Sequence, residues 1–430
     1  MKVLQIFNQY RSQFNGEAMV VRQTAELIER FGGKVFDWQR NSQKMKSGVL
    51  SKIKAAVGGI YNRTSYRDAR AILEFHQPDV VHTHNVYPLF SPSVLVAAKD
   101  AGYPVVMSVH NQNLTCPKAD HLLNGKLCDR CYQGAEINCV LQNCRNNIFE
   151  SMAYAIRSHA ARSRGWFSNN VTRFIALTEF SRQRLVGAGY AAEKINVLSN
   201  MVTGVESAVD RPEEGGYVAF AGRMSEEKGV DLLIDAAKEL PTIPFKLAGN
   251  GPCLERWQNS APNNVEFLGG IEQEDMPKFY RGARLLVLPS RVNEMCPLVV
   301  SEAMNVGIPV ITSNMGGQAE LVDDQITGRL FEPENASDLR KQIEQVWHRT
   351  DLIREYGRAG FEKARREYRQ DVYFKRLVEI YRQAILDVGR DDTCIDNILA
   401  NTPEDTRVLT PASLPLEEGF HEASTLAIEP

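Results

Sequence analysis

Long apolar runs, an excess of cations and the common nucleotide-binding glycine motifs are all missing from this sequence of 430 residues. No run approaches the roughly 18–20 apolar residues that a helix needs to cross a bilayer. The net charge of −3 gives no indication of nucleic acid as a partner. Gly-x-Gly-x-x-Gly does not follow the first expected strand, and Gly-x4-Gly-Lys-Ser/Thr does not occur. NAD-linked dehydrogenases and P-loop enzymes are therefore disfavoured.

The composition is typical of a soluble globular protein. Hydrophobic residues make up 43% and charged residues 24% of the chain, as in average soluble domains. The stretch Met1–Phe7 is too short for a signal peptide and is expected to form a first strand. We therefore expect a cytoplasmic protein with two or three domains.

Short apolar runs alternate with helical patterns in two successive sets. This alternation predicts an α/β fold with two Rossmann-like, doubly wound parallel-sheet domains. The first set of expected strands is Val3–Phe7, Val80–Thr83, Val105–Val109, Phe174–Leu177 and Ile195–Leu198, and the second is Tyr217–Ala221, Phe245–Ala248, Val265–Leu268, Leu285–Leu288 and Pro309–Thr312.

Composition also suggests where the domains begin and end. We expect an N-terminal domain over 1–203, a polar linker over 203–216 and a C-terminal domain over 212–370. A helix over 371–388 should cross back to the N-terminal domain and leave a cleft that closes on a ligand. Residues 391–430 are polar and acidic with scattered prolines, which predicts a disordered tail.

Glu294 and Glu302 flank the end of an expected strand and the start of a helix. The strand Leu285–Leu288 runs into the loop that carries Glu294, and the helix begins near Pro297. Ligands of open α/β sheets bind at this carboxyl edge, where a carboxylate can accept hydrogen bonds from sugar hydroxyls. The backbone N–H groups of Leu298 and Val299 can hold a phosphate. Two ordinary surface glutamates are the alternative interpretation.

A second loop between a strand and a helix carries two cations. Gly222, Arg223, Lys228 and Gly229 follow the strand Tyr217–Ala221. Arginine binds a diphosphate as a fork and lysine as a point charge. The alternative is a solvated, salt-bridged turn, because Glu226 and Glu227 lie between the cations.

These motifs occur in an order that resembles a known family. Gly-Arg-x4-Lys-Gly at 222–229 is followed by Gly249-Asn250-Gly251-Pro252, the Glu294/Glu302 pair with Ala303-Met304, Gly307-Ile308-Pro309-Val310, and Gly316-Gly317-Gln318-Ala319-Glu320. The pattern resembles the retaining glycosyltransferases of the GT-B fold known as family four. The likeness covers roughly 1–388 and is more specific in the C-terminal half.

The resemblance implies a nucleotide-sugar donor site. Arg223 and Lys228 would hold the diphosphate, Glu294 the hydroxyls of the transferred sugar and Glu302 the ribose. The loop with Asn250 and Gly251 would pass near the base. No metal is needed for catalysis, because the two cations replace it, and no Asp-x-Asp occurs.

In the N-terminal half, the family places a glycine-containing loop at Gly16, facing the donor diphosphate, and a histidine at His110, contacting the donor sugar. His110 ends the strand Val105–Val109, at the ligand edge. A simple turn is the alternative for Gly16. For His82 and His84, core packing and an acceptor role are equally good interpretations.

The resemblance also implies the reaction. With no carboxylate nucleophile in evidence, configuration would be retained by front-face departure and attack, with His110, Glu294, Arg223 and Lys228 as the catalytic residues. UDP-sugars are the commonest donors in this family and GDP-sugars the next. The acceptor would be a glycan or a lipid-linked sugar. The expected pathway is the synthesis of bacterial surface polysaccharide or exopolysaccharide. A nucleotide-sugar epimerase or hydrolase and a non-catalytic sugar-binding relative are the alternatives.

Five cysteines crowd into an expected insertion at 111–145. Cys-x2-Cys with further cysteines is a metal-ligand pattern, and four thiolates complete a structural zinc site. Reduced thiols, redox pairs and an iron–sulfur cluster are alternatives. Four of the following five would bind: Cys116, Cys128, Cys131, Cys139 and Cys144.

A basic stretch from Arg40 to Arg70 interleaves cations with apolar residues. It contains eight cations and one acid, Asp68. This composition suits an interfacial helix on an anionic membrane, which would place the protein peripherally on the inner membrane face. A solvated basic face is an equally good interpretation.

Overall fold

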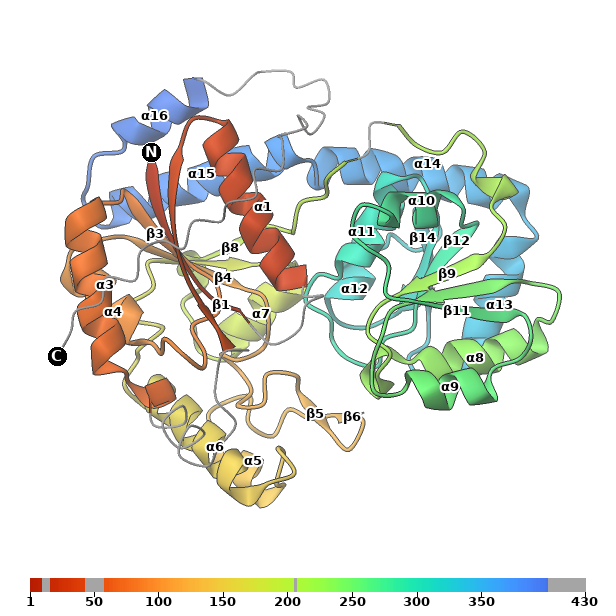
Figure 1. The fold of residues 1–430 in the computed structure, drawn as a ribbon, viewed down its shortest axis with the longest axis horizontal. Helices are drawn as coiled ribbons and strands as arrows, with labels where there is room; N and C mark the ends of the chain where they lie inside the picture. The colour runs from red at the N-terminus through yellow and green to blue at the C-terminus, as the bar shows by residue number, and fades with distance from the viewer. Residues whose placement is uncertain (10–15, 43–57, 205–206, 401–430) are drawn as a thin grey trace.

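The computed structural model describes residues 1–9, 16–42, 58–204 and 207–400, and within them the chain forms two parallel sheets of six strands each. The N-terminal sheet has the order β2-β1-β3-β4-β7-β8, and the C-terminal sheet β11-β10-β9-β12-β13-β14 (Figure 1). The first contains β1 (Lys2–Gln9), β2 (Lys34–Asn41), β3 (Val80–Thr83), β4 (Val105–Val109), β7 (Arg173–Ala176) and β8 (Ile195–Val197), and the second β9 (Val218–Ala221), β10 (Phe245–Ala248), β11 (Val265–Gly269), β12 (Leu285–Leu288), β13 (Val310–Ser313) and β14 (Gly328–Phe331). The predicted α/β class with two parallel-sheet domains is confirmed.

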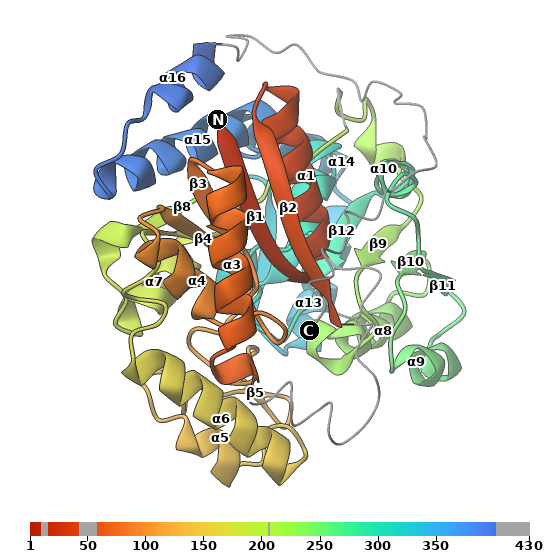
Figure 2. The same cartoon turned by 60° about the vertical axis from the view of Figure 1, so that its left-hand side comes forward.

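Helices cover both faces of each sheet (Figure 2). Because side chains alternate along a strand, Val3 faces one helix layer and Leu4 the other. The N-terminal domain contains α1 (Gly16–Arg30), α3 (Arg63–His76), α4 (Ser93–Asp100), α6 (Ile148–Ser163) and α7 (Glu179–Gly187). The C-terminal domain contains α8 (Val230–Glu239), α9 (Leu254–Ser260), α10 (Met276–Arg281), α11 (Leu298–Asn305), α12 (Gly316–Leu321), α13 (Ala336–Trp347) and α14 (Thr350–Glu367).

The cysteine-rich segment forms a small lobe of its own after β4. It contains a hairpin of β5 (Leu122–Leu123) and β6 (Lys126–Leu127), and the short helix α5 (Ile137–Leu141). The helix α5 packs against α6 at the end of the N-terminal domain (Figure 1). The lobe is therefore an addition to the sheet and not a part of it.

Helix α15 (Gln370–Asp387) returns to the N-terminal domain after α14. Its residues Phe374, Leu377 and Tyr381 are fully buried in one cluster with Val3 and Val80. The hydroxyl of Tyr381 lies 2.7 Å from His82 Nδ1, beneath the sheet. The chain thus passes from the second domain back to the first, so the two are joined twice.

The expectation of a disordered tail from residue 391 is wrong for its first part. Residues Thr393–Ala400 form helix α16, which packs on α15. Its Ile395 and Ile398 are buried, and this apolar pair at helical spacing is what holds the helix in place. Residues 401–430 lie outside the described part of the chain.

The loops at the carboxyl edge of the C-terminal sheet pack backbone against backbone. A Cβ atom at Gly249, which has φ of +136°, would lie 1.8 Å from the Gly222 carbonyl oxygen. A Cβ atom at Gly229, with φ of +67°, would lie 2.0 Å from the Pro289 carbonyl oxygen. Only glycine allows these approaches and these φ values, so the loops after β9, β10 and β12 form one block.

Gly249→Ala should lower the free energy of unfolding by about 3 kcal/mol, because the substitution combines a strained φ with a backbone clash. Urea unfolding measures the change. Gly216→Ala is the matched control, because no atom lies within 4 Å of its Cβ position, and it should stay within about 0.5 kcal/mol of the parent. Equal losses in the two variants would contradict this account.

Candidate functional site

The centre of the candidate site is an ion pair between two loops at the carboxyl edge of the C-terminal sheet. Lys228 Nζ lies 2.5 Å from Glu294 Oε1, and the Ser290 hydroxyl donates to the same oxygen at 2.7 Å. Only 23% of the lysine side chain and 16% of the glutamate side chain are exposed. The structure thus brings together two predicted residues that lie 66 positions apart.

Gln318 fixes the backbone around Glu294. Its side-chain oxygen accepts from Glu294 N at 2.8 Å, and its amide nitrogen donates to Val292 O at 3.0 Å. Gly317 N donates to Glu294 O at 2.7 Å. The first turn of α12 therefore sets the position of the Glu294 loop. Sequence reasoning quoted Gln318 only as part of a motif and missed this role.

Arg291 ties the Glu294 loop to the cation loop. Its guanidinium group donates to both carboxylate oxygens of Asp231, at 2.6 and 2.7 Å, and to Glu226 O at 3.1 Å. Asp231 raises the pKa of this guanidinium further. These contacts join the Glu294 loop to the cation loop and to the first turn of α8. The sequence offered no signal for it beyond its position beside Ser290.

Unlike Lys228, Arg223 is not part of an ion pair in the described part of the chain. Its side chain is exposed, and it has no ion-pair partner within the described ranges. Glu226 pairs with Arg256 at 3.0 Å, while Glu227 accepts from the Ser225 hydroxyl at 2.5 Å. The turn is therefore salt-bridged in part, and its glutamates leave Arg223 available to an anionic ligand.

Glu302 lies on α11 and has its own hydrogen bonds. Its carboxylate accepts from the Tyr280 hydroxyl at 2.8 Å and from Gln273 Nε2 at 3.3 Å. Burial raises the pKa of Glu302, which these two donors oppose. The side chain is thus held at one orientation, pointing toward α10 and the segment before it.

Asn250 and Gly251 lie in the loop after β10, beside the cation loop. Asn250 O accepts from Met224 N at 3.0 Å. A Cβ atom at Gly251 would lie 2.3 Å from Met224 O. The structure therefore brings both predicted residues next to the Arg223 loop.

Two helix N-termini meet where the domains face each other. A Cβ atom at Gly16, at the start of α1, would lie 3.2 Å from Leu298 Cδ1, at the start of α11. The unpaired N–H groups of a helix start carry partial positive charge. Gly16, Leu298 and Val299 are thereby gathered at one point, as expected of residues that share a phosphate ligand.

His110, at the end of β4, is hydrogen-bonded to a second histidine. His110 Nε2 lies 2.9 Å from His84 Nδ1, and burial lowers the pKa of His110 to about 4. Both rings are neutral at pH 7, since burial also lowers the pKa of His84. The buried His84 Nε2 has no hydrogen-bond partner among the described residues. These two histidines line a hollow that also contains Glu17, where burial raises the carboxyl pKa to about 8.

His82 has a structural role. It lies 2.8 Å from the Ser108 hydroxyl and 2.7 Å from the Tyr381 hydroxyl, and it is fully buried. Of the two interpretations left open for His82, the contacts favour core packing, whereas His84 faces the hollow.

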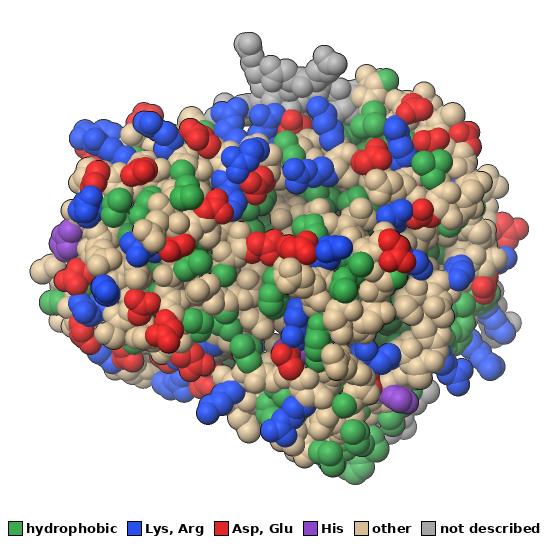
Figure 3. All heavy atoms as spheres, turned by 180° about the vertical axis from the view of Figure 1, so that it is seen from behind, with side chains coloured by type: hydrophobic (Ala, Val, Ile, Leu, Met, Phe, Trp, Pro, Cys, Tyr) green, Lys and Arg blue, Asp and Glu red, His purple; other side chains and the backbone are tan. Residues whose placement is uncertain are grey.

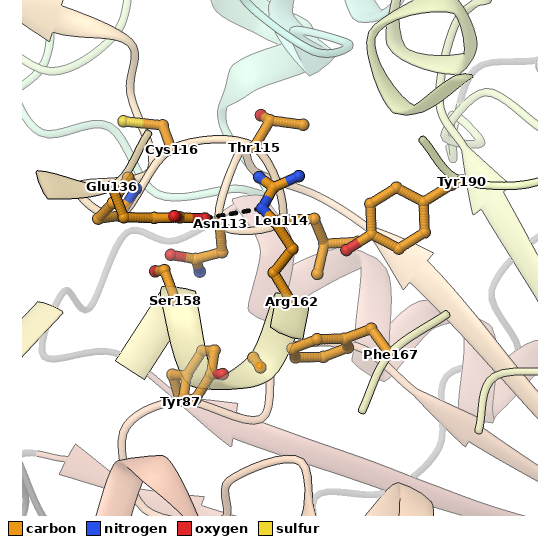
Figure 4. Close-up of a pocket in the computed structure, with 12 residues that line it drawn as sticks. Tyr87, Asn113, Leu114, Thr115, Cys116, Glu136, Ser158, Arg162, Phe167 and Tyr190 are labelled. Carbon is orange, nitrogen blue, oxygen red and sulfur yellow. Dashed lines mark hydrogen bonds and ion pairs between the residues drawn. The ribbon is translucent and has the colours of Figure 1, made fainter. Parts of the chain in front are cut away.

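A second pocket lies beside this hollow, under α6 (Figure 4). The ion pair of Glu136 and Arg162, at 2.7 Å, forms part of its wall. The pocket shares Tyr87, Asn113 and Phe167 with the hollow at the histidines. The two cavities are therefore neighbours in the N-terminal domain.

The five cysteines of the lobe have free thiols, and electrostatic interactions among them show that they lie near one another. Cys131 and Cys139 are buried, and burial and the neighbouring thiols raise the pKa of each to about 12. In the part of the chain that is described, however, no three cysteine, histidine or acidic side chains form a set that could hold a metal ion. The structural zinc site stays a prediction.

Freshly purified, reduced protein should contain about one equivalent of zinc or iron by elemental analysis, if four thiolates bind a metal. Cys131→Ser should lose it, and Cys253→Ser, outside the lobe, should keep it. Less than about half an equivalent in the parent protein would rule the metal out.

In the comparison with known proteins, each half of the chain matches a family model. Residues 56–203 match the family model Glycosyltransferase Family 4, and residues 206–363 match Glycosyl transferases group 1. An uncharacterized glycosyltransferase of Methanocaldococcus jannaschii is 35% identical over 35% of this chain and 44% of its own length. The lipopolysaccharide 1,2-N-acetylglucosaminetransferase of Salmonella typhimurium is 31% identical over 38% of this chain and 46% of its own. The matched stretch spans less than half the length of either relative.

The fold has a solved counterpart. The structure of HepE from Anabaena in complex with UDP superposes with a TM-score of 0.62, at 17% identity, over 88% of this chain and 99% of that one. This likeness concerns the fold. The two family models, which between them match 56–203 and 206–363, show that the chain belongs to the family-four glycosyltransferases, and the solved structure shows that it has their GT-B fold.

Proposed function

We propose that this protein is a retaining glycosyltransferase that moves a sugar from a UDP-sugar, or next a GDP-sugar, to a glycan or lipid-linked acceptor. The observation that carries the proposal is the half-buried pair of Lys228 and Glu294 beside the free guanidinium group of Arg223. A structural relative was solved with UDP, and a sequence relative is a lipopolysaccharide 1,2-N-acetylglucosaminetransferase. These two support a nucleotide-sugar donor and a role in bacterial surface polysaccharide synthesis.

Each donor-site residue would bind a different part of the nucleotide-sugar. Arg223 would bind the diphosphate first, because its charge is free, and Lys228 would turn from Glu294 to the phosphates. Glu294 Oε1 would then accept from sugar hydroxyls while Ser290 keeps the carboxylate in place. Glu302 would hold the ribose, opposite the base near Asn250.

The proposed reaction requires stabilisation of the negative charge that develops on the leaving diphosphate. The bond between the anomeric carbon and the diphosphate oxygen breaks on the face from which the acceptor hydroxyl attacks, and the leaving phosphate takes the acceptor proton. Arg223, Lys228 and the helix starts at Gly16 and Leu298 stabilise the leaving charge. Glu17 is a poor candidate for a covalent nucleophile, because a pKa of about 8 keeps its carboxyl protonated at neutral pH.

The acceptor would enter from the N-terminal domain. The neutral His84 and His110 line a hollow there, and the buried His84 Nε2 lacks a partner among the described residues. A sugar hydroxyl would satisfy this nitrogen. No metal takes part in the proposed reaction, and a cysteine-bound zinc ion would serve only to hold the lobe.

UDP should raise the unfolding temperature, because a ligand at about 100 times its Kd stabilises the folded state by about 2.7 kcal/mol. A thermal-shift series with UDP, GDP, ADP and their sugar conjugates measures the effect. Arg223→Ala should abolish the shift, and Arg256→Ala, which removes an exposed arginine paired with Glu226, should keep it. No shift with any nucleotide would argue for a non-catalytic relative.

Arg223→Ala should also lower turnover by about 10²–10³-fold, the usual cost of losing one group that stabilises transition-state charge. Transfer to acceptor and release of free sugar are measured separately, with Arg256→Ala as the control. Turnover within a few-fold of the parent would contradict the role of Arg223. Donor consumption without acceptor would favour a hydrolase or epimerase.

A further inference from the structure

The outer side of the cysteine lobe is covered with large apolar side chains. On α6, Phe149 is 73% exposed, Met152 44% and Ile156 48%, and these three follow one another at helical spacing. On the neighbouring α5, Ile137 and Leu141 are 61% and 70% exposed. We call this surface the α5–α6 face; it consists of Ile137, Leu141, Ile148, Phe149, Met152 and Ile156.

The amphipathic pattern of α6 is the reverse of that expected of a surface helix. Its buried residues are small or polar, namely Ser151, Ala155, Arg157 and Ala161. The large apolar residues face outward, where packing within this chain does not use them. Soluble monomers rarely leave such a contiguous patch in water, so the face is a candidate docking surface.

The face lies at one end of the molecule. Figure 3 shows hydrophobic side chains gathered at its lower edge, where Figure 1 places α5 and α6. Its inner side carries Ser158, Ala161 and Arg162, which line the pocket next to the His84 hollow. The face and the proposed acceptor side therefore share one helix.

Exposed arginines lie beside α5 and directly after the end of α6. The acids nearby are paired: Glu136 with Arg162 at 2.7 Å, and Glu150 with Arg145 at 3.9 Å. Just after the end of α6, the ring centroids of Trp166 and Tyr61 lie 5.3 Å apart, and the guanidinium group of Arg164 lies over the Trp166 ring.

This aromatic contact brings the start of α3 and its exposed Arg63 next to α6. Near α5, Asn138 Nδ2 donates to Arg130 O at 2.9 Å, and the Arg130 side chain is exposed. Within the described ranges, Arg63, Arg130 and Arg164 have no ion-pair partner. The rim of the face is therefore cationic.

We propose that the α5–α6 face docks on an anionic lipid bilayer, with its apolar side chains at the boundary between headgroups and acyl chains and its rim arginines on lipid phosphates. Apolar side chains on one helix face, cations beside them and an aromatic residue at the edge are the properties of an interfacial helix. No described helix is long and apolar enough to cross the membrane, and interfacial docking requires none.

A second copy of the chain fits this face less well. Two copies meeting by a two-fold axis would bring their cationic rims together, and like charges in contact oppose association. A bilayer offers phosphates to the same arginines. Docking there would bring the pocket under α6 close to a lipid-linked acceptor; this last point rests on the proposed function, whereas the docking does not.

Basic residues from Arg40 to Arg70 had suggested a membrane contact from sequence alone. Their central part, 43–57, lies outside the described residues. The α5–α6 face shares only the rim residue Arg63 with this stretch, and its apolar side chains lie outside it, so the experiment must tell the two apart.

Sedimentation with sucrose-loaded vesicles tests the proposal on the full-length protein. The vesicles contain either phosphatidylcholine alone or phosphatidylcholine with about 30 mol% phosphatidylglycerol. The parent should bind the anionic vesicles, and the double variant Phe149→Glu/Ile156→Glu should bind about tenfold or more weakly. The control Phe75→Glu/Ile326→Glu changes the same residue types at other exposed positions, 82% and 59% exposed, and should bind like the parent.

Unchanged unfolding temperatures in both variants show that the fold is kept. Equal sedimentation of the parent and the Phe149→Glu/Ile156→Glu variant would overturn the proposal and favour the basic stretch 40–70. Equal binding of the parent to neutral and anionic vesicles would overturn the choice of anionic lipid. A dimer in analytical ultracentrifugation that the double variant abolishes would make the face a contact between copies and overturn it as well. None of these readouts depends on catalytic activity.

Discussion

Backbone packing at the carboxyl edge of the C-terminal sheet is the constraint on which the candidate site depends. Gly249 and Gly229 let the loops after β9, β10 and β12 approach without intervening side chains. Arg291 then joins the loops after β12 and β9, and Gln318 holds the loop after β12 against α12, both through hydrogen bonds to backbone atoms. Lys228 and Glu294 can therefore form a close pair although they belong to different loops. A site built this way is rigid before any ligand arrives, which is what electrostatic stabilisation of a leaving group requires.

The two domains contribute different kinds of chemistry. The C-terminal domain contributes charge: a free arginine, a paired lysine and two carboxylates. The N-terminal domain contributes neutral polar groups, since burial lowers the pKa of His82 to about 3 and that of His110 to about 4. A charged donor and an uncharged hydroxyl acceptor would each meet the environment that suits it. The division also keeps the histidines from competing with Arg223 for phosphate.

The sequence predicts the buried parts of this fold well and its edges poorly. Interior strands such as Val105–Val109 and Leu285–Leu288 are continuous apolar runs, because both of their faces are covered. Two of the four edge strands, β2 and β14, were not expected, since the second half of β2 is largely polar and β14 has only two large apolar residues. Helix α16 was missed because its apolar residues, among them Ile395, Ile398 and Leu399, occupy one short stretch of a segment whose composition as a whole predicts disorder.

For the site, residues with a charge and a family motif could be found from the sequence. Residues that act by holding a loop could not, because Gln318 and Arg291 act on backbone atoms distant in sequence. The exposed face of α6 was likewise hidden, since the same spacing of apolar residues describes a buried stripe and an exposed one. Only the burial of each side chain in the structure distinguishes a buried stripe from an exposed one.

The carboxylate of Glu320 has a consequence for how the domains move. It accepts from the backbone N–H groups of Glu179 and Phe180, at 2.7 and 2.8 Å, and so binds the first turn of a helix in the other domain. Thr178 already caps that helix within its own domain, so separation would leave α7 folded and transfer two N–H groups to water. These two hydrogen bonds therefore favour the domain arrangement of the structure without preventing the domains from separating, and an enzyme that admits a substrate and releases a product on every cycle needs both properties.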